Sequence, residues 1–127
     1  MQITGLDHLV ITTADIDKCV GFYEGVLGLR HEVKAGRHAF YFGKQKLNIH
    51  CRPAEFLPAA LHPIHGSQDL CLVAEGDIFA IKREIEAKGY PLETDVVQRT
   101  GALGAMQSLY VRDAAGNLIE IAVYKGL

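Results

Sequence analysis

Two short stretches of the same form decide the fold of this chain: His8-Leu9-Val10-Ile11 and Asp69-Leu70-Cys71-Leu72. Each begins with a polar residue and continues with three apolar ones, as expected of a strand packed on a core. A glycine stands three positions before each stretch, and their first residues are 61 positions apart. A repeat of this length indicates two copies of one supersecondary unit.

A helix is predicted after each of these strands. Asp15 and Asp77 stand at N-cap positions, where a carboxylate accepts a hydrogen bond from a free backbone N–H. The apolar residues that follow have the three-and-four spacing of one buried helical face. Each pattern ends at a glycine, Gly28 or Gly89, which can adopt the left-handed helix stop. These two glycines are again 61 positions apart.

Three short strands, and no second helix, fit behind each predicted helix. The predicted strands are 30–34, 38–42, 46–52, 92–98, 105–112 and 118–124. We therefore predict an α+β fold of two βαβββ modules, residues 3–52 and 67–125, within one domain of residues 1–127. Prolines in residues 53–66 exclude a sheet interior there, so this segment is the expected linker.

Composition narrows the class of protein. The formal charge of −2 over 127 residues offers no cationic surface for a nucleic acid. No apolar run approaches the ~20 residues that span a bilayer. Three cysteines without close pairs, and no secretory leader ahead of them, favour reduced thiols in the cytoplasm. We expect a cytoplasmic protein that binds neither nucleic acid nor a membrane.

Polar side chains interrupt the apolar strands at matched places. His8 and Glu120 are placed among apolar residues of the first and last strands, and a buried carboxylate is costly without a partner. Asn48 and His50 share one strand face, because positions two apart do so, and Asp69 begins the repeated strand. Such nitrogen and oxygen donors suit divalent iron, manganese, nickel, cobalt or zinc. Taken singly, an inward histidine is more often a hydrogen-bonded core residue than a metal ligand.

Three further residues are candidate substrate contacts. Ser108 and Tyr110 line the predicted pocket by strand alternation. Arg99 begins a glycine-rich stretch, 99–104, that we expect to be a mobile loop closing over the pocket, with a solvated arginine as the ordinary alternative. Cys71 is expected to be a small core residue, with nothing to mark it as a nucleophile.

The chain also resembles a known family. The residues that carry the resemblance are Gly5 to Ile11, Phe22-Tyr23, Val26 to Leu29 and Arg112 to Glu120. They are similar to the glyoxalase, bleomycin-resistance and extradiol-dioxygenase superfamily, also called vicinal oxygen chelate. Within it, 46–50 and 99–102 resemble the glyoxalase-domain-containing protein 5 subgroup, whose bacterial relatives are labelled virulence proteins.

The resemblance implies a cleft with metal ligands on the first and fourth strands of each module. His8 and Glu120 match two of these positions, whereas Asp69 stands where many members carry His or Gln. Two alignments of the fourth strand are open, one placing Asn48 and the other His50 at the ligand position. Imidazole is the better ligand for a transition metal, so we predict a set of His8, His50 and Glu120.

Three functions remain open at this stage. The first is a metal-dependent lyase or isomerase of glyoxalase type that chelates two adjacent oxygens of a small molecule, with Asp69 and Glu120 as catalytic carboxylates. The second is an extradiol-type dioxygenase on divalent iron, although Asp69 departs from its usual ligand set. The third is a metal-free protein that binds a drug or metabolite. The resemblance also implies a homodimer.

Overall fold

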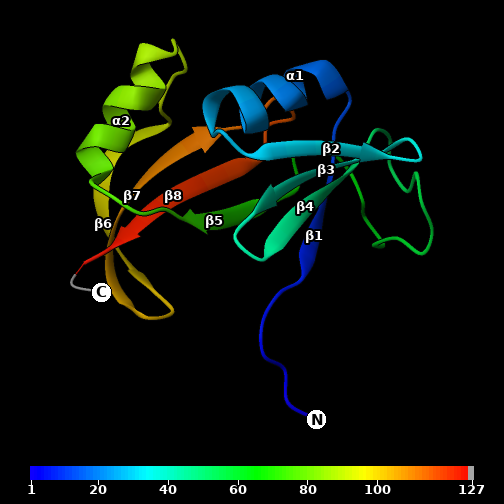
Figure 1. Cartoon of the computed structure of the whole chain (residues 1–127), viewed down its shortest axis with the longest axis horizontal. Helices are drawn as coiled ribbons and strands as arrows, with labels where there is room; N and C mark the ends of the chain where they lie inside the picture. Colours follow the sequence, from blue (N-terminus) through cyan, green and yellow to red (C-terminus); the bar gives the residue numbers. More distant parts are fainter. Residues whose placement is uncertain (126–127) are drawn as a thin grey trace.

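The computed structural model describes residues 1–125 and contains two four-stranded mixed sheets with few helices (Figure 1). The first sheet has the order β1-β4-β3-β2, and the second has the order β5-β8-β7-β6. The strands are β1 (His8–Thr12), β2 (Arg30–Lys34), β3 (Arg37–Phe42), β4 (Gln45–His50), β5 (Asp69–Val73), β6 (Thr94–Gly101), β7 (Gly104–Arg112) and β8 (Leu118–Tyr124). Two βαβββ modules of the predicted α+β class are therefore confirmed.

The first helical segment differs from a regular α-helix. It begins as α1 (Ile16–Val20), with the Asp15 side chain accepting from the Lys18 N–H at 3.1 Å. It then continues as a π-helix, η1 (Gly21–Val26). The widened turn is visible where the Leu27 N–H donates to the Phe22 carbonyl, five residues back, at 3.0 Å. Apolar spacing predicted the helix but did not distinguish a 3.6-residue turn from a wider one.

The second helix follows the prediction more closely. The Asp77 side chain caps α2 (Ile78–Ala87) by accepting from the Phe79 N–H at 3.1 Å. Ile78 and Ile85 are its buried residues, and Gly89 behind it adopts a positive φ of 73°. The N-cap, the apolar face and the glycine stop therefore all act as the sequence indicates.

Both modules repeat one pairing scheme. β1 pairs in parallel with β4, and β5 pairs in parallel with β8, while the remaining neighbours are antiparallel. Val10 lies opposite Asn48, and Cys71 lies opposite Glu120. Since Val10 and Cys71 are themselves 61 positions apart, Asn48 and Glu120 occupy equivalent places in the two sheets.

The two modules share one hydrophobic core. Its buried members include Ile11 and Phe40 from the first module and Ile85 and Ile119 from the second. Phe22 of η1 also contacts Tyr90 of the second module, with ring centroids 5.0 Å apart. Removing these apolar surfaces from water is what joins the modules into one domain.

The stretch 99–104 is not a loop, contrary to our prediction. β6 runs through Gly101 and β7 starts at Gly104, so only two residues form the turn. Gly104 has a φ of 124°, a conformation open to glycine, which lets the chain reverse immediately. Residues 53–66 contain no helix or strand, as expected of a linker.

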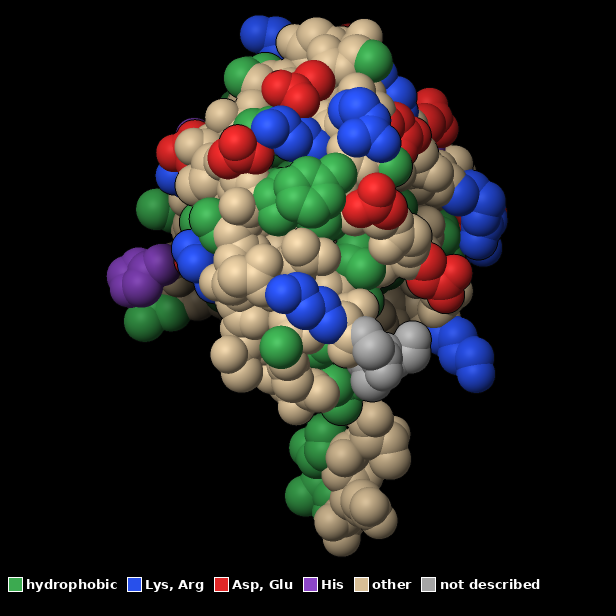
Figure 2. Space-filling model, turned by 90° about the vertical axis from the view of Figure 1, so that its left-hand side faces the viewer, with side chains coloured by type: hydrophobic (Ala, Val, Ile, Leu, Met, Phe, Trp, Pro, Cys, Tyr) green, Lys and Arg blue, Asp and Glu red, His purple; other side chains and the backbone are tan. Residues whose placement is uncertain are grey.

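The outer surface carries mixed charge. Figure 2 shows acidic and basic side chains interspersed on one face, with an extended arm projecting below the body. This arm is the N-terminal segment, whose Ile3 and Leu6 are 83% and 69% exposed. Over residues 1–125, no helix is long and apolar enough to cross a membrane.

Candidate functional site

A cleft lies between the first sheet and the linker. Its volume is about 590 Å³. His8 and Thr12 of β1 line it together with Asn48 and His50 of β4, which share one sheet face because they are spaced by two. The linker, from Phe56 onward, forms the opposite wall. Three of the predicted site residues, His8, Asn48 and His50, therefore line one cleft.

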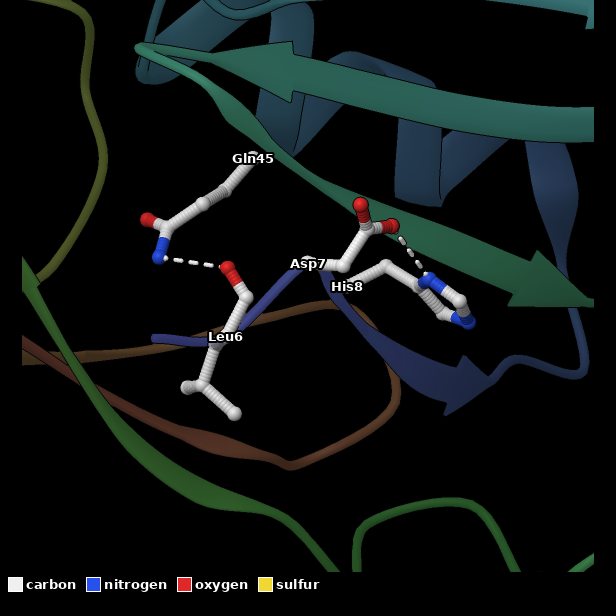
Figure 3. A network of polar contacts seen from close by, with 4 residues as sticks. All are labelled: Leu6, Asp7, His8 and Gln45. Carbon is white, nitrogen blue, oxygen red and sulfur yellow. Dashed lines mark hydrogen bonds and ion pairs between the residues drawn. The ribbon is translucent and has the colours of Figure 1, made fainter. Parts of the chain in front are cut away.

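His8 is held in a defined orientation at the start of β1. Its Nδ1 lies 2.8 Å from the Asp7 carboxylate, so the Nε2 atom faces away from that carboxylate (Figure 3). The Gln45 side chain donates to the Leu6 carbonyl at 3.0 Å and so fixes the backbone just before Asp7. The His8 side chain is 44% exposed, so its place among apolar residues of the sequence does not make it a buried residue. The cause is its position as the first residue of the strand, beyond the cover of the core.

His50 is the buried histidine of this cleft. It is 9% exposed, and its ring meets Phe56 edge-on with centroids 5.3 Å apart. Its Nδ1 is buried and has no hydrogen-bond partner within the described residues. Because an unsatisfied buried donor or acceptor costs about 1–3 kcal/mol, this nitrogen is a candidate contact for a ligand.

The strand register separates the two candidates on β4. His8 lies opposite Lys46, so Asn48 is two residues and His50 four residues further along the strand. At about 3.3 Å per residue, His50 is offset from His8 by roughly 13 Å along the strand. Asn48 is the nearer neighbour of His8 and the equivalent of Glu120. His50 as the metal ligand stays a prediction.

Glu120 belongs to the other sheet. The half-buried carboxylate accepts a hydrogen bond from the Ser108 hydroxyl at 2.6 Å. Cys71 lies opposite it, exposed rather than in the core as we predicted, because it stands on the sheet face away from the helices. Partial desolvation and the Glu120 charge raise the pKa of the Cys71 thiol to about 11. Ser108 thus orients the carboxylate, and Cys71 stays protonated beside it.

The remaining predicted residues lie on the second sheet as well. Tyr110 is directly opposite Glu120. The Arg99 guanidinium donates from Nε to the Tyr110 hydroxyl at 3.0 Å, so a rigid strand, not a loop, positions it. Asp69 is exposed at the first position of β5.

The structure does not bring the predicted metal ligands together in one chain. Among residues 1–125, no three His, Cys, Asp or Glu side chains are close enough to hold an ion. His8 and His50 line the cleft of the first sheet, whereas Glu120 is on the second. The donor types suit a divalent metal, but a single copy supplies them only as two halves.

Some site residues were absent from our sequence predictions. Lys46 lines a second hollow beside Asn48, and its spacing of two from Asn48 could have revealed it. Arg37 and Phe56 line the same hollow, but no local pattern joins a strand end to a linker. His31 and His38 are half-buried, with Nε2 and Nδ1 2.9 Å apart.

Comparison with known proteins identifies relatives along nearly the whole chain. The profile of the glyoxalase/bleomycin resistance protein/dioxygenase superfamily matches residues 5–121. Virulence protein STM3117 of Salmonella typhimurium is 44% identical over 125 residues, covering 98% of this chain and 87% of that protein. Glyoxalase domain-containing protein RDO1 of Mycosarcoma maydis is 42% identical, covering 98% and 71%.

Solved structures agree with this relationship. The crystal structure of the Salmonella virulence protein superposes with a TM-score of 0.94 at 42% identity, over 98% of this chain and 100% of that one. Lactoylglutathione lyase from Agrobacterium tumefaciens superposes with a TM-score of 0.75 at 26% identity, over 97% and 96%.

Proposed function

Since the chain belongs to the glyoxalase/bleomycin resistance protein/dioxygenase superfamily, we propose that it is a metal-dependent lyase or isomerase. Its substrate would be a small molecule that offers two adjacent oxygens to the metal. The proposed ligands are His8 and Glu120, with Asn48 as the fourth-strand ligand, because the predicted His50 is offset from His8 by roughly 13 Å along the strand. The similarity to a lactoylglutathione lyase supports this reaction class over oxygen chemistry.

The observation that carries the proposal is the orientation of two donors by neighbouring groups. Asp7 holds His8 through Nδ1, which leaves Nε2 as the ligating atom. Ser108 holds one oxygen of Glu120 and leaves the other available. Metal ligands in proteins are commonly fixed by such outer hydrogen bonds. Two unrelated surface residues would need no partner of this kind.

We propose further that two copies of the chain complete the site. One copy would supply His8, and its partner would supply Glu120, because a single chain does not assemble the set. The faces that carry these residues also expose apolar side chains, Val10 at 37% and Val73 at 63%. Covering them with a second copy would remove this apolar surface from water. A homodimer follows from this arrangement.

The chain's own groups can supply the remaining chemistry. A bound divalent ion acts as a Lewis acid that stabilises negative charge on substrate oxygens. Asp69, exposed at the start of β5, is the proposed general base that moves a proton next to them. Arg99 and Tyr110, joined by their hydrogen bond, are proposed to form the side of the pocket that contacts the substrate.

Mixing two variants tests the proposal directly. Chains with His8→Ala and chains with Glu120→Ala should each form dimers without bound metal. A mixed dimer keeps one intact pair of half-sites, so it should bind one ion where the wild-type dimer binds two. Metal content by mass spectrometry on purified mixed dimers is the measurement. His65→Ala, which changes an exposed histidine outside the cleft lining, is the matched control and should keep full metal content.

Two outcomes would contradict this function. Wild-type protein that holds no stoichiometric first-row metal after supplementation would exclude the metal-dependent reaction. Metal-loaded wild-type protein whose mixed dimers stay empty would exclude the shared site.

A metal-free binding protein is the second candidate, favoured by the size of the cleft, about 590 Å³, and by its partly apolar linker wall. A binder of this kind would keep its ligand affinity after His8→Ala and Glu120→Ala. The metal-dependent enzyme would lose both metal and substrate affinity.

A further inference from the structure

A second hollow, of about 170 Å³, adjoins the cleft on the first sheet. It shares four lining residues with the cleft, so the same side chains border both: Arg37, Asn48, His50 and Phe56. The cleft and the hollow therefore border one another along these side chains.

The hollow is strongly cationic. Lys34, Arg37 and Lys46 line it, against a single carboxylate, Glu32. That carboxylate is already paired with Arg30. Within residues 1–125, none of the three cations has a carboxylate within 4.0 Å. The chain as a whole carries a formal charge of −2, so this local excess of positive charge does not reflect composition.

Aromatic rings, not carboxylates, contact two of these three cations. The Arg37 guanidinium lies over the Phe56 ring, with its central carbon 4.0 Å from the centroid. The Lys46 ammonium lies 5.7 Å from the centroid of Tyr41. A guanidinium stacked on a ring keeps its N–H donors free in the plane of the group. Arg37 is thus positioned for a ligand that presents oxygen acceptors.

The buried His50 gives an independent indication. Its imidazole is 9% exposed, lines the hollow, and leaves Nδ1 without a partner in the described part of the chain. A buried polar atom in this condition is satisfied when a ligand supplies the missing hydrogen bond. An oxyanion can accept from an imidazole N–H and from the cations around it.

We infer that the substrate of this protein is an organic anion whose carboxylate or phosphate group is bound by Arg37, Lys46 and His50. This inference rests on the proposed function for the other end of the substrate, which would place its adjacent oxygens toward His8. A carboxylate and a phosphate present the same oxygen acceptors to a guanidinium. Uncharged diols and carbonyl compounds would leave the hollow unfilled and bind weakly.

The test uses two probes, inorganic phosphate and malonate, titrated separately into the wild-type protein after chelator treatment. Backbone amide shifts by NMR should saturate and cluster at residues 34–50. Arg37→Ala should weaken the affinity for the preferred anion about tenfold, because a charge-assisted pair of hydrogen bonds is lost. The probe that binds more tightly identifies the phosphate or the carboxylate class.

Two variants provide the controls. Arg83→Ala removes an exposed arginine on α2, outside the lining of the hollow, and should leave anion affinity unchanged. Arg37→Lys should restore part of the affinity, since it keeps the charge but loses the planar fork. An amide chemical-shift dispersion equal to that of the wild-type protein would show that each variant keeps the fold.

The inference is overturned if neither anion gives saturable shifts in residues 34–50. It is also overturned if Arg37→Ala and Arg83→Ala have equal effects. Metal content is measured on metal-supplemented wild-type protein before the chelator treatment, so the two proposals fail separately. If the protein binds an anion but holds no metal, the anion site stands and the metal-dependent reaction is excluded. If it holds metal but binds neither anion, the anion site is excluded and the metal-dependent reaction stands.

Discussion

Replacing Tyr23 with phenylalanine should weaken the junction between the two modules. Tyr23 is fully buried in η1, and its hydroxyl donates to the Asp113 carboxylate at 2.6 Å. Asp113 lies between β7 and β8, where it also accepts from the backbone of Ala115 and from the backbone and side chain of Asn117. One hydrogen bond thus joins the helical segment of the first module to the hairpin of the second.

The expected loss follows from the charge of the acceptor. Hydrogen bonds to charged groups contribute about 1.5–3 kcal/mol. Asp113 keeps three other donors in the variant, so we expect the lower part of this range, about 1.5–2 kcal/mol. Urea denaturation of both proteins at one concentration, monitored by circular dichroism, measures the difference in unfolding free energy.

Tyr90→Phe is the matched control. The Tyr90 hydroxyl donates at the same distance, 2.6 Å, but to the neutral backbone carbonyl of Arg112. A neutral hydrogen bond contributes about 0.5–1.5 kcal/mol. If Tyr23→Phe costs no more than Tyr90→Phe, the buried charged acceptor does not stabilise the junction and the reasoning is wrong.

Alkaline pH gives the same variant a second readout. Burial, the Asp113 charge and their hydrogen bond raise the pKa of Tyr23 far above its ordinary value of 10. Above pH 10 the unfolded chain has lost the tyrosine proton while the folded chain retains it, so unfolding is favoured as pH rises. The contribution of Tyr23 falls by about 1.4 kcal/mol per pH unit there. Tyr23→Phe cannot ionise, so its stability should decline less steeply, and parallel declines would refute the assignment.

Three further substitutions have outcomes that the structure predicts. A Cβ at Gly101 would lie 2.3 Å from the Tyr124 hydroxyl, so Gly101→Ala should cost about 1–3 kcal/mol in denaturant unfolding. Gly21→Ala, with helical φ and open space, should be stabilising by about 0.4–1 kcal/mol, and equal effects of the two changes would contradict this. Cys71 should react slowly with iodoacetamide at pH 8, because its pKa is about 11. Glu120→Gln should speed this alkylation by removing a neighbouring negative charge, as peptide mass spectrometry would measure, and an unchanged rate would show that Glu120 does not act on the thiol.

Much of the fold was predictable because it repeats. The strand pattern from His8 and the one from Asp69 have equal spacing to their glycine stops, so each module supports the reading of the other. The capping carboxylates Asp15 and Asp77 also act locally, through bonds to residues two or three positions away. Features that depend on neighbours in the chain can be read from the chain.

The features that the sequence predicted wrongly depend on tertiary packing and on turn geometry instead. His8 has the same strand parity as a buried residue, yet it is exposed because nothing covers the start of β1. Cys71 has inward parity, but its face of the second sheet lies away from the helices. At Gly104 a single positive φ converts an expected loop into a hairpin. Alternation assigns a face, and tertiary packing decides which face is buried.

The candidate site also depends on tertiary structure that the sequence pattern does not contain. Parity allowed Asn48 and His50 equally, and only the parallel register, with Val10 opposite Asn48, distinguishes their positions. Sequence spacing also could not tell that His8 and Glu120 belong to separate sheets. Under the proposed function, the two side chains meet only when a second copy of the chain is bound. In the proposed dimer, each module would carry half of the metal donors, and one module from each chain would complete a set. This proposed division of ligands between modules is the reason to measure metal binding on mixed dimers rather than on single variants.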